Sequence, residues 1–167
     1  EDVVVLEEGG AYRVEQYGRF KPTEAFRYLY RDGGASPVFG IGDTPEIFLL
    51  LARCVGGGSV INGGVCFRTP PYILEQWAET LGLTDYGPQK MEPFFAEVER
   101  ILHVEKVPDR LLNRGVLKIR EAATRAGYES ANISRNVENC CGCARCIVGC
   151  PHDAKRTAQL EYLDKAI

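Results

Sequence analysis

The glycine-rich loop at residues 54–64 is one of two stretches whose residue types and spacing could do chemistry. It reads Cys-Val-Gly-Gly-Gly-Ser-Val-Ile-Asn-Gly-Gly. Glycine lacks a Cβ, so such a backbone can press closely against another group and gather its N–H groups around a flat or anionic ligand. Ser59 and Asn62 add a hydroxyl and an amide. We predict a cofactor cradle that includes Gly57 and Gly58, with Ser59 and Asn62 facing one concavity. The alternative is an ordinary tight turn in a sheet.

The cysteine-rich segment at residues 139–151 is the second stretch. Its spacing is C-x2-C-x2-C-x3-C-P, the bacterial ferredoxin pattern for a four-iron cluster. This pattern predicts a metal site on Cys140, Cys143, Cys146 and Cys150. In two-cluster ferredoxins the last cysteine of a run ligates the other cluster. With one run present, Cys150 would have to bend back, or another thiol would have to fill the fourth corner. The other candidates for that corner are Cys141, Cys66 and Cys54.

Two other interpretations of the cysteines stay open. Zinc is an alternative metal, although the spacing suits it less. The thiols could also simply pack a loop against the body of the protein. Five of the seven cysteines crowd between residues 140 and 150, so they cannot all pair sensibly with one another as disulfides. Reduced thiols favour a cytoplasmic location.

Secondary-structure elements must position these two stretches. Residues 3–6 form an uninterrupted apolar run, which is typical of a strand buried in a parallel sheet. Glu7 follows that run, ahead of a glycine pair, where dinucleotide-binding folds place an acid that hydrogen-bonds a ribose. No G-x-G-x-x-G loop precedes it, and an ordinary strand end is the alternative. Residues 46–55 are predicted to be the strand that leads into the glycine loop, and residues 66–68 a short extended piece.

Helical periodicity predicts three further elements, at residues 72–81, 91–102 and 115–126. The first should end at Gly82, and the last should begin at the Asn113 cap and end at Gly127. We expect the apolar stripes of all three helices to pack in the core. His103 follows the second helix, and we interpret it as a surface or capping residue.

Composition narrows the class of protein. The chain has 167 residues, of which 45% are hydrophobic, enough for one compact domain. Its net charge of −3 comes without a basic stripe, which argues against a nucleic-acid-binding protein. The longest apolar run, residues 47–52, is too short to span a bilayer. The chain opens on a strand-like run and stops in a helix-like pattern, so we expect both ends to be truncated.

A resemblance joins these pieces. Residues 3–10 and 52–64, the helix around Trp77 and residues 91–99 are similar to the glucose–methanol–choline (GMC) family of FAD-dependent oxidoreductases. Residues 149–155 resemble the branch similar to cholesterol oxidases and long-chain alcohol oxidases. The resemblance implies an α/β fold, with residues 1–167 forming part of a Rossmann-like FAD-binding domain with helical and loop insertions.

The resemblance also implies site residues. Glu7 would hold the adenosine ribose, and Gly58 and Ser59 would line the pyrophosphate and flavin. Asn62, Gly63 and Val65 would lie against the isoalloxazine ring. The implied reaction moves a hydride from an alcohol carbon to flavin N5, with a histidine as base. No residue of this chain occupies the family's catalytic histidine position, so we expect this chain alone to be inactive.

The main hypothesis is therefore an FAD-dependent oxidoreductase acting on the CH–OH group of a small-molecule alcohol. Either oxygen or a redox carrier would reoxidise the flavin. The alternative is a ferredoxin-type electron-transfer module carrying a four-iron four-sulfur cluster. A structural protein whose cysteines bind zinc or nothing is a third hypothesis.

Overall fold

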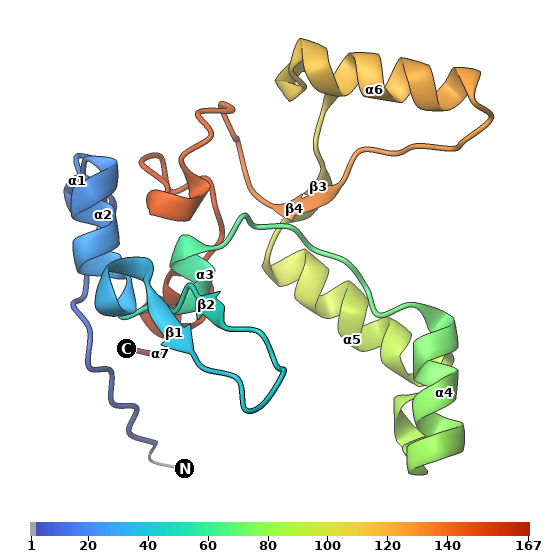
Figure 1. The fold of residues 1–167 in the computed structure, drawn as a ribbon, viewed down its shortest axis with the longest axis horizontal. Coiled ribbons are helices and arrows are strands. Elements are labelled where there is room, and N and C mark those ends of the chain that lie inside the picture. The colour runs from blue at the N-terminus through green and yellow to red at the C-terminus, as the bar shows by residue number, and fades with distance from the viewer. Residues whose placement is uncertain (1–2) are drawn as a thin grey trace. The chain divides into compact units, whose positions relative to one another are not determined.

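The computed structural model describes residues 3–167, which divide into two compact units. The first unit contains the chain up to residue 64 together with residues 138–167, and the second contains residues 65–137. The glycine loop and the cysteine-rich segment, far apart in the sequence, therefore belong to the same unit (Figure 1).

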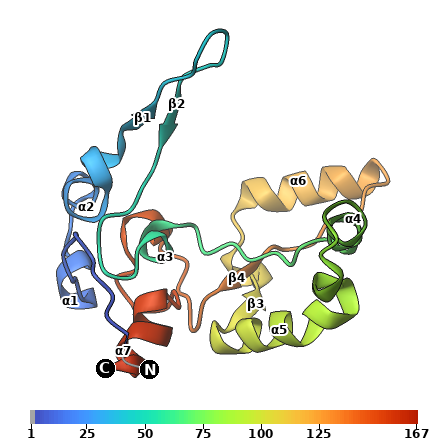
Figure 2. The same cartoon turned by 90° about the horizontal axis from the view of Figure 1, so that it is seen from below.

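The first unit consists of short elements around an apolar core. Its helices and strands are α1 (Val14–Tyr17), α2 (Pro22–Leu29), β1 (Ser36–Val38), β2 (Ile47–Leu49), α3 (Gly58–Ile61) and α7 (Asp164–Ala166). The strands β1 and β2 pair antiparallel as a hairpin that extends away from α2 (Figure 2). Single helical turns lie at Arg31–Gly34 and Cys146–Val148, and a π-helical turn at Gln159–Leu163.

The core of the first unit lies between α2, α3 and the start of the glycine loop. Leu29 on α2 and Ala25 one turn earlier are fully buried, as expected for residues four apart on one helix face. They belong to a cluster that also holds Tyr17, Tyr30, Cys54, Val60, Ile61 and Val148. The glycine loop is thus anchored in the core by Cys54, Val60 and Ile61.

The strand predicted at residues 3–6 is absent from the structure. Val3, Val4, Val5 and Leu6 are 74–91% exposed and form no ladder. A parallel strand needs a neighbour for its N–H and C=O groups. Among the described residues, the isolated bridge nearest to this stretch is the parallel one between Gly10 and Cys54, which lies outside residues 3–6. The strand predicted at residues 46–55 is also shorter than expected, because only β2 pairs continuously.

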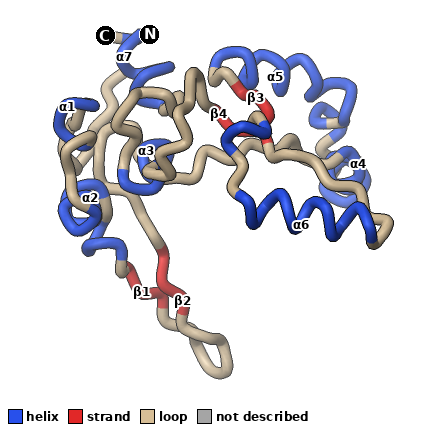
Figure 3. Tube along the Cα trace, turned by 90° about the horizontal axis from the view of Figure 1, so that it is seen from above, coloured by secondary structure: helices blue, strands red, loops and turns tan. Residues whose placement is uncertain are grey.

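The second unit is mainly helical (Figure 3). Its elements are α4 (Pro71–Leu81), α5 (Pro88–Ile101), β3 (Val104–Lys106), α6 (Arg114–Arg125) and β4 (Ser134–Asn136). The three predicted helices are confirmed together with their caps. Gly82 ends α4 with a φ of 67°, and Asn113 Oδ1 accepts a 3.0 Å hydrogen bond from the Val116 N–H at the start of α6. Residues 66–68 form no strand.

The apolar stripes of these helices are not packed in a core as expected. Trp77, Phe94 and Val98 are 39%, 65% and 45% exposed, and Leu74 alone is buried on the three helices. Phe94 and Val98 instead line an open cavity of about 430 Å³ beside α5. Periodicity identifies the apolar face of a helix, but it does not supply the surface that covers it.

Helices and two small antiparallel sheets together confirm the predicted α/β class. None of the helices among residues 3–167 combines the length and the apolar character needed to cross a membrane.

Candidate functional site

The glycine loop has one packed edge and one open edge. Gly56 and Gly57 both have positive φ, 91° and 54°, which favours glycine. A Cβ on Gly56 would lie 2.9 Å from side-chain atoms of Gln159 and Val60, so this edge is closed. A Cβ on Gly57 or Gly58 would meet no atom within 4 Å. The Cβ side of both glycines is therefore open to a ligand, while the Gly57 N–H itself donates to the Cys54 carbonyl at 2.8 Å.

An apolar cavity of about 390 Å³ begins at this open edge. Its lining combines residues of the loop and α3 with one residue of α2, the residues that directly follow α2 and β2, and one residue of the cysteine-rich segment. They are Gly58, Ile61, Asn62, Gly63, Phe26, Tyr30, Leu50 and Ile147. Asn62 is the amide side chain in this lining and is itself exposed. Three predicted site residues, Gly58, Asn62 and Gly63, are thus brought together at one cavity.

Ser59 points elsewhere, which corrects the expectation that it faces the same concavity as Asn62. Its hydroxyl donates to the Gly56 carbonyl at 2.6 Å and accepts from the Ala158 N–H at 2.9 Å. Serine hydroxyls commonly satisfy nearby backbone groups in this way. The side chain therefore ties the loop to residue 158, and Ser59 does not line the cavity.

Val65 starts the second unit, where it forms an antiparallel bridge with Arg135. It is 48% exposed. Its predicted contact with a flavin ring stays a prediction.

Glu7 lies near the start of the glycine loop. Its Oε1 accepts a 2.7 Å hydrogen bond from the Gly9 N–H. Gly9 lies against the residue that precedes the glycine loop. A Cβ on Gly9 would lie 2.1 Å from the Arg53 carbonyl oxygen. Burial, with a further contribution from the charge of Glu7, raises the pKa of the Cys54 thiol to about 11. Cys54 is therefore a neutral core thiol at neutral pH, and the Glu7 carboxylate is close enough to influence it.

Lys155 is a site residue that the sequence analysis missed. It is 1% exposed, and its ammonium donates hydrogen bonds of 2.8 Å each to the carbonyl oxygens of Val60, Asn62 and Cys146. A buried charge is costly unless hydrogen bonds replace its hydration, and here three carbonyls do so. Lys155 thereby joins α3 and the residue after it to the cysteine-rich segment. The available signal was its place in residues 149–155, which carry part of the family resemblance.

Three further side chains hold the cysteine-rich segment and the turn that follows it against the N-terminal part of the same unit. Arg145 donates to the Phe20 carbonyl at 2.6 Å, and the Tyr30 hydroxyl donates to the Ile147 carbonyl. The Tyr17 hydroxyl donates to Asp153 Oδ1 at 3.3 Å. Burial, together with the neighbouring Asp153 charge, raises the pKa of Tyr17, which stays a neutral donor. The segment is therefore fixed to the core at several points.

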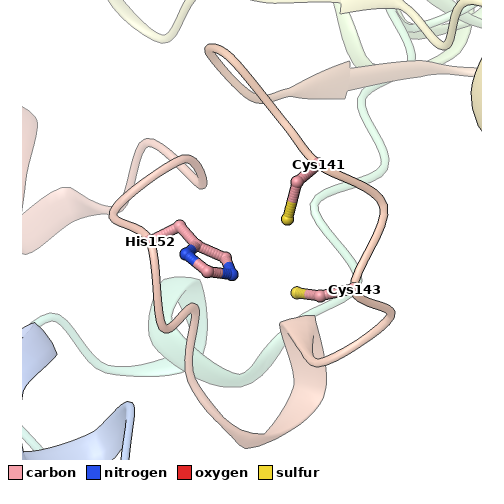
Figure 4. Close-up of side chains that lie close together, drawn as sticks. All are labelled: Cys141, Cys143 and His152. Atoms are coloured by element: carbon pink, nitrogen blue, oxygen red, sulfur yellow. The ribbon is translucent and has the colours of Figure 1, made fainter.

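The cysteines of this segment are arranged differently from the predicted set. Ligand atoms of Cys141, Cys143 and His152 lie within 4.8 Å of one another, and all three residues are exposed (Figure 4). Cys150 is buried, and the Cys140 thiol accepts from the Gly142 N–H at 3.4 Å. Cys143 is the one member of the predicted set found in this group. A cluster on Cys140, Cys143, Cys146 and Cys150 stays a prediction.

Comparison with known proteins adds an independent result. The family model described as GMC oxidoreductase matches residues 26–167. An uncharacterized GMC-type oxidoreductase of Mycobacterium tuberculosis (strain ATCC 25618 / H37Rv) is 35% identical over 165 residues, covering 99% of this chain and 26% of the relative. A long-chain-alcohol oxidase of Arabidopsis thaliana is 27% identical over 172 residues, covering 99% of this chain and 21% of the relative. The chain thus spans about a quarter of the length of these relatives. No solved structure matches it significantly.

Proposed function

This chain belongs to the GMC oxidoreductase family, and on that premise we propose that the protein is an FAD-dependent oxidoreductase acting on the CH–OH group of an alcohol. The N-terminal domain of this family is Rossmann-like and binds FAD. The observation that carries the proposal is the open backbone of Gly58 at the rim of an apolar cavity.

The residues present fit a flavin dinucleotide. Its pyrophosphate is anionic, and backbone N–H groups without a Cβ in front of them allow a close approach. Gly58 offers such a backbone at the cavity, whereas the Gly57 N–H already donates to the Cys54 carbonyl at 2.8 Å. The flavin ring system is flat and largely apolar, and Phe26 and Ile61 give the cavity an apolar lining. Asn62 supplies an amide at the rim, and Glu7 would bind the ribose hydroxyls.

When bound, FAD supplies the acceptor for a hydride from the alcohol carbon. The side chains of this chain bind and orient the cofactor. Lys155 acts indirectly, because it fixes the carbonyls of Val60 and Asn62 and so the position of the loop. We assign no catalytic residue to this chain. Its two histidines have other surroundings, because His103 follows α5 and His152 lies beside two thiols.

An alcohol is the proposed substrate because several relatives carry the name long-chain-alcohol oxidase. Oxygen and a redox carrier are both compatible electron acceptors. Alcohol oxidation is measured with oxygen and, in its absence, with an artificial electron-acceptor dye. Turnover with oxygen indicates an oxidase, and turnover with the dye alone indicates a dehydrogenase.

The Gly58→Ala variant tests the cofactor site. Gly58 begins α3 and has space for a Cβ, so the variant should fold, while its methyl group projects into the open edge. We expect FAD binding, measured by flavin fluorescence on the whole protein, to weaken roughly tenfold, which corresponds to about 1.4 kcal/mol.

Gly87→Ala is the matched control. Gly87 caps the start of α5, and the nearest atom to its Cβ would be the Thr84 carbonyl oxygen at 4.0 Å. This variant should bind FAD like the unmodified protein. Equal FAD affinity in both variants would remove the glycine loop from the proposed site.

An electron-transfer module with a four-iron cluster is the second candidate function, favoured by the spacing of the cysteine run. The absorption spectrum separates the two. A flavin gives two resolved bands in the visible and near-ultraviolet, whereas a cluster gives a broad brown shoulder with iron and acid-labile sulfide in the sample.

A further inference from the structure

The group formed by Cys141, Cys143 and His152 has the composition of a metal site. Two sulfur atoms and one ring nitrogen point toward one another from a loop and from the turn that follows Pro151 (Figure 4). Neither Cys141 nor Cys143 is in a disulfide. Thiolate and imidazole are the preferred ligands of zinc.

The spacing of these atoms suits a tetrahedral ion. Zinc–sulfur bonds of about 2.3 Å and zinc–nitrogen bonds of about 2.0 Å place tetrahedral ligand atoms roughly 3.5–3.8 Å apart. The three ligand atoms already lie within 4.8 Å of one another. Small rotations of exposed side chains therefore suffice to close the site.

The backbone around the group is held in a shape that brings its two halves together. Ala144 and Asp153 have positive φ, 58° and 48°, which is uncommon for residues other than glycine. Such conformations persist when surrounding contacts determine them. Here Arg145 is bonded to the Phe20 carbonyl, and Asp153 to the Tyr17 hydroxyl. Both anchors lie within two residues of a member of the group.

We propose that Cys141, Cys143 and His152 bind one zinc ion, with the fourth coordination position open to water. Binding releases the two thiol protons to solvent, and the two thiolate charges balance the charge of the ion. The ion closes the loop between residues 141 and 152 by linking its two ends. This site uses Cys141, which the ferredoxin spacing leaves out, and a histidine. It does not depend on flavin binding.

Metal analysis of the whole protein tests the proposal. Protein purified without chelator and equilibrated with zinc chloride should retain one zinc ion per chain, measured by mass spectrometry of the metal. Replacing zinc with cobalt should produce a thiolate-to-cobalt charge-transfer band. In Cys143→Ser and in His152→Ala the zinc affinity should fall by more than roughly tenfold, because outer-shell changes alone cost that much.

Cys140→Ser is the matched control, since Cys140 is in the same loop and outside the group. It should keep both the zinc and the cobalt band, and circular dichroism should show that all variants stay folded. Three results would overturn the proposal: no zinc bound, zinc retained in the Cys143→Ser/His152→Ala double variant, or iron and sulfide whose loss follows Cys140→Ser and Cys146→Ser.

Discussion

The two units hold their charged side chains in different ways. In the first unit, Lys155 and Glu161 are 1% and 3% exposed. Lys155 donates to carbonyls of distant segments, and Glu161 pairs with Arg156 and Lys165, which are close to it in sequence. In the second unit, ion pairs such as Arg68–Glu92 and Arg120–Asp109 lie at the surface. Exposed pairs contribute about 0–1 kcal/mol, whereas removing one partner of a buried charge costs several times more. The first unit should therefore be sensitive to single polar substitutions and the second tolerant of them.

Lys155→Met should have the largest effect. Methionine keeps most of the side-chain volume but leaves the carbonyls of Val60, Asn62 and Cys146 without their shared donor. A buried carbonyl left without a donor costs about 1–3 kcal/mol, so for these three carbonyls we expect a loss of about 3–5 kcal/mol in the free energy of unfolding, measured by urea denaturation. Hydrogen exchange should show the loosening at α3 and the cysteine-rich segment.

Lys90→Met is its control, because Lys90 is exposed and pairs with Asp85 at the surface. This variant should change stability by no more than about 0.5 kcal/mol. Equal losses in the free energy of unfolding for Lys155→Met and Lys90→Met would show that the two units do not differ in their sensitivity to polar substitutions.

Glu161 makes the stability of the first unit depend on pH. Burial by itself would raise the pKa of its carboxyl group, but hydrogen bonds from Lys165 and Arg156 outweigh burial, and the pKa is lowered. A carboxylate with a lowered folded-state pKa stabilises the protein above its unfolded pKa, about 4.3, and this stabilisation is lost as the pH falls further.

Glu161→Gln should therefore lower stability at neutral pH, by less than Lys155→Met because glutamine keeps one acceptor oxygen. It should also flatten the fall in stability between about pH 5 and pH 3. Asp153 is a necessary comparison, since burial raises its pKa and gives its contribution the opposite sign. Urea denaturation across this pH range measures how the free energy of unfolding depends on pH. If that dependence has the same slope in Glu161→Gln as in the unmodified protein, the stabilising role assigned to Glu161 is wrong.

Asn113→Ala should have a moderate effect in the second unit. The variant removes the side chain that caps α6, at a typical cost of about 1 kcal/mol. Thermal unfolding followed by circular dichroism measures it. Ser130→Ala, at an exposed loop position, is expected to be neutral, and an equal loss there would rule out the cap as the cause.

Arg125→Ala should have the smallest effect. Arg125 forms an exposed pair with Glu121 one turn away on α6. Its removal should cost about 0.3–0.5 kcal/mol, and the cost should shrink as salt is added. A loss above that for Asn113→Ala would mean that the surface charges of the second unit matter more than we infer.

Local patterns determined much of this molecule. The three long helices, the Gly82 terminus and the Asn113 cap follow from periodicity and capping, because those interactions join residues within one or two turns. The positive φ of Gly56 and Gly57 could be anticipated for the same reason, because this conformation is a local property of glycine.

Tertiary structure decided what those elements face. Residues 3–6 have the pattern of a buried strand but find no neighbouring strand in the described chain, and the stripe of α5 stays largely exposed. Ser59 turns to residue 158, and Lys155 reaches carbonyls up to 95 residues away in sequence. Cysteine spacing alone selects Cys140 over Cys141, whereas the folded loop brings Cys141 and Cys143 to His152. Contacts between segments distant in sequence depend on how the whole chain packs, and no local pattern encodes them.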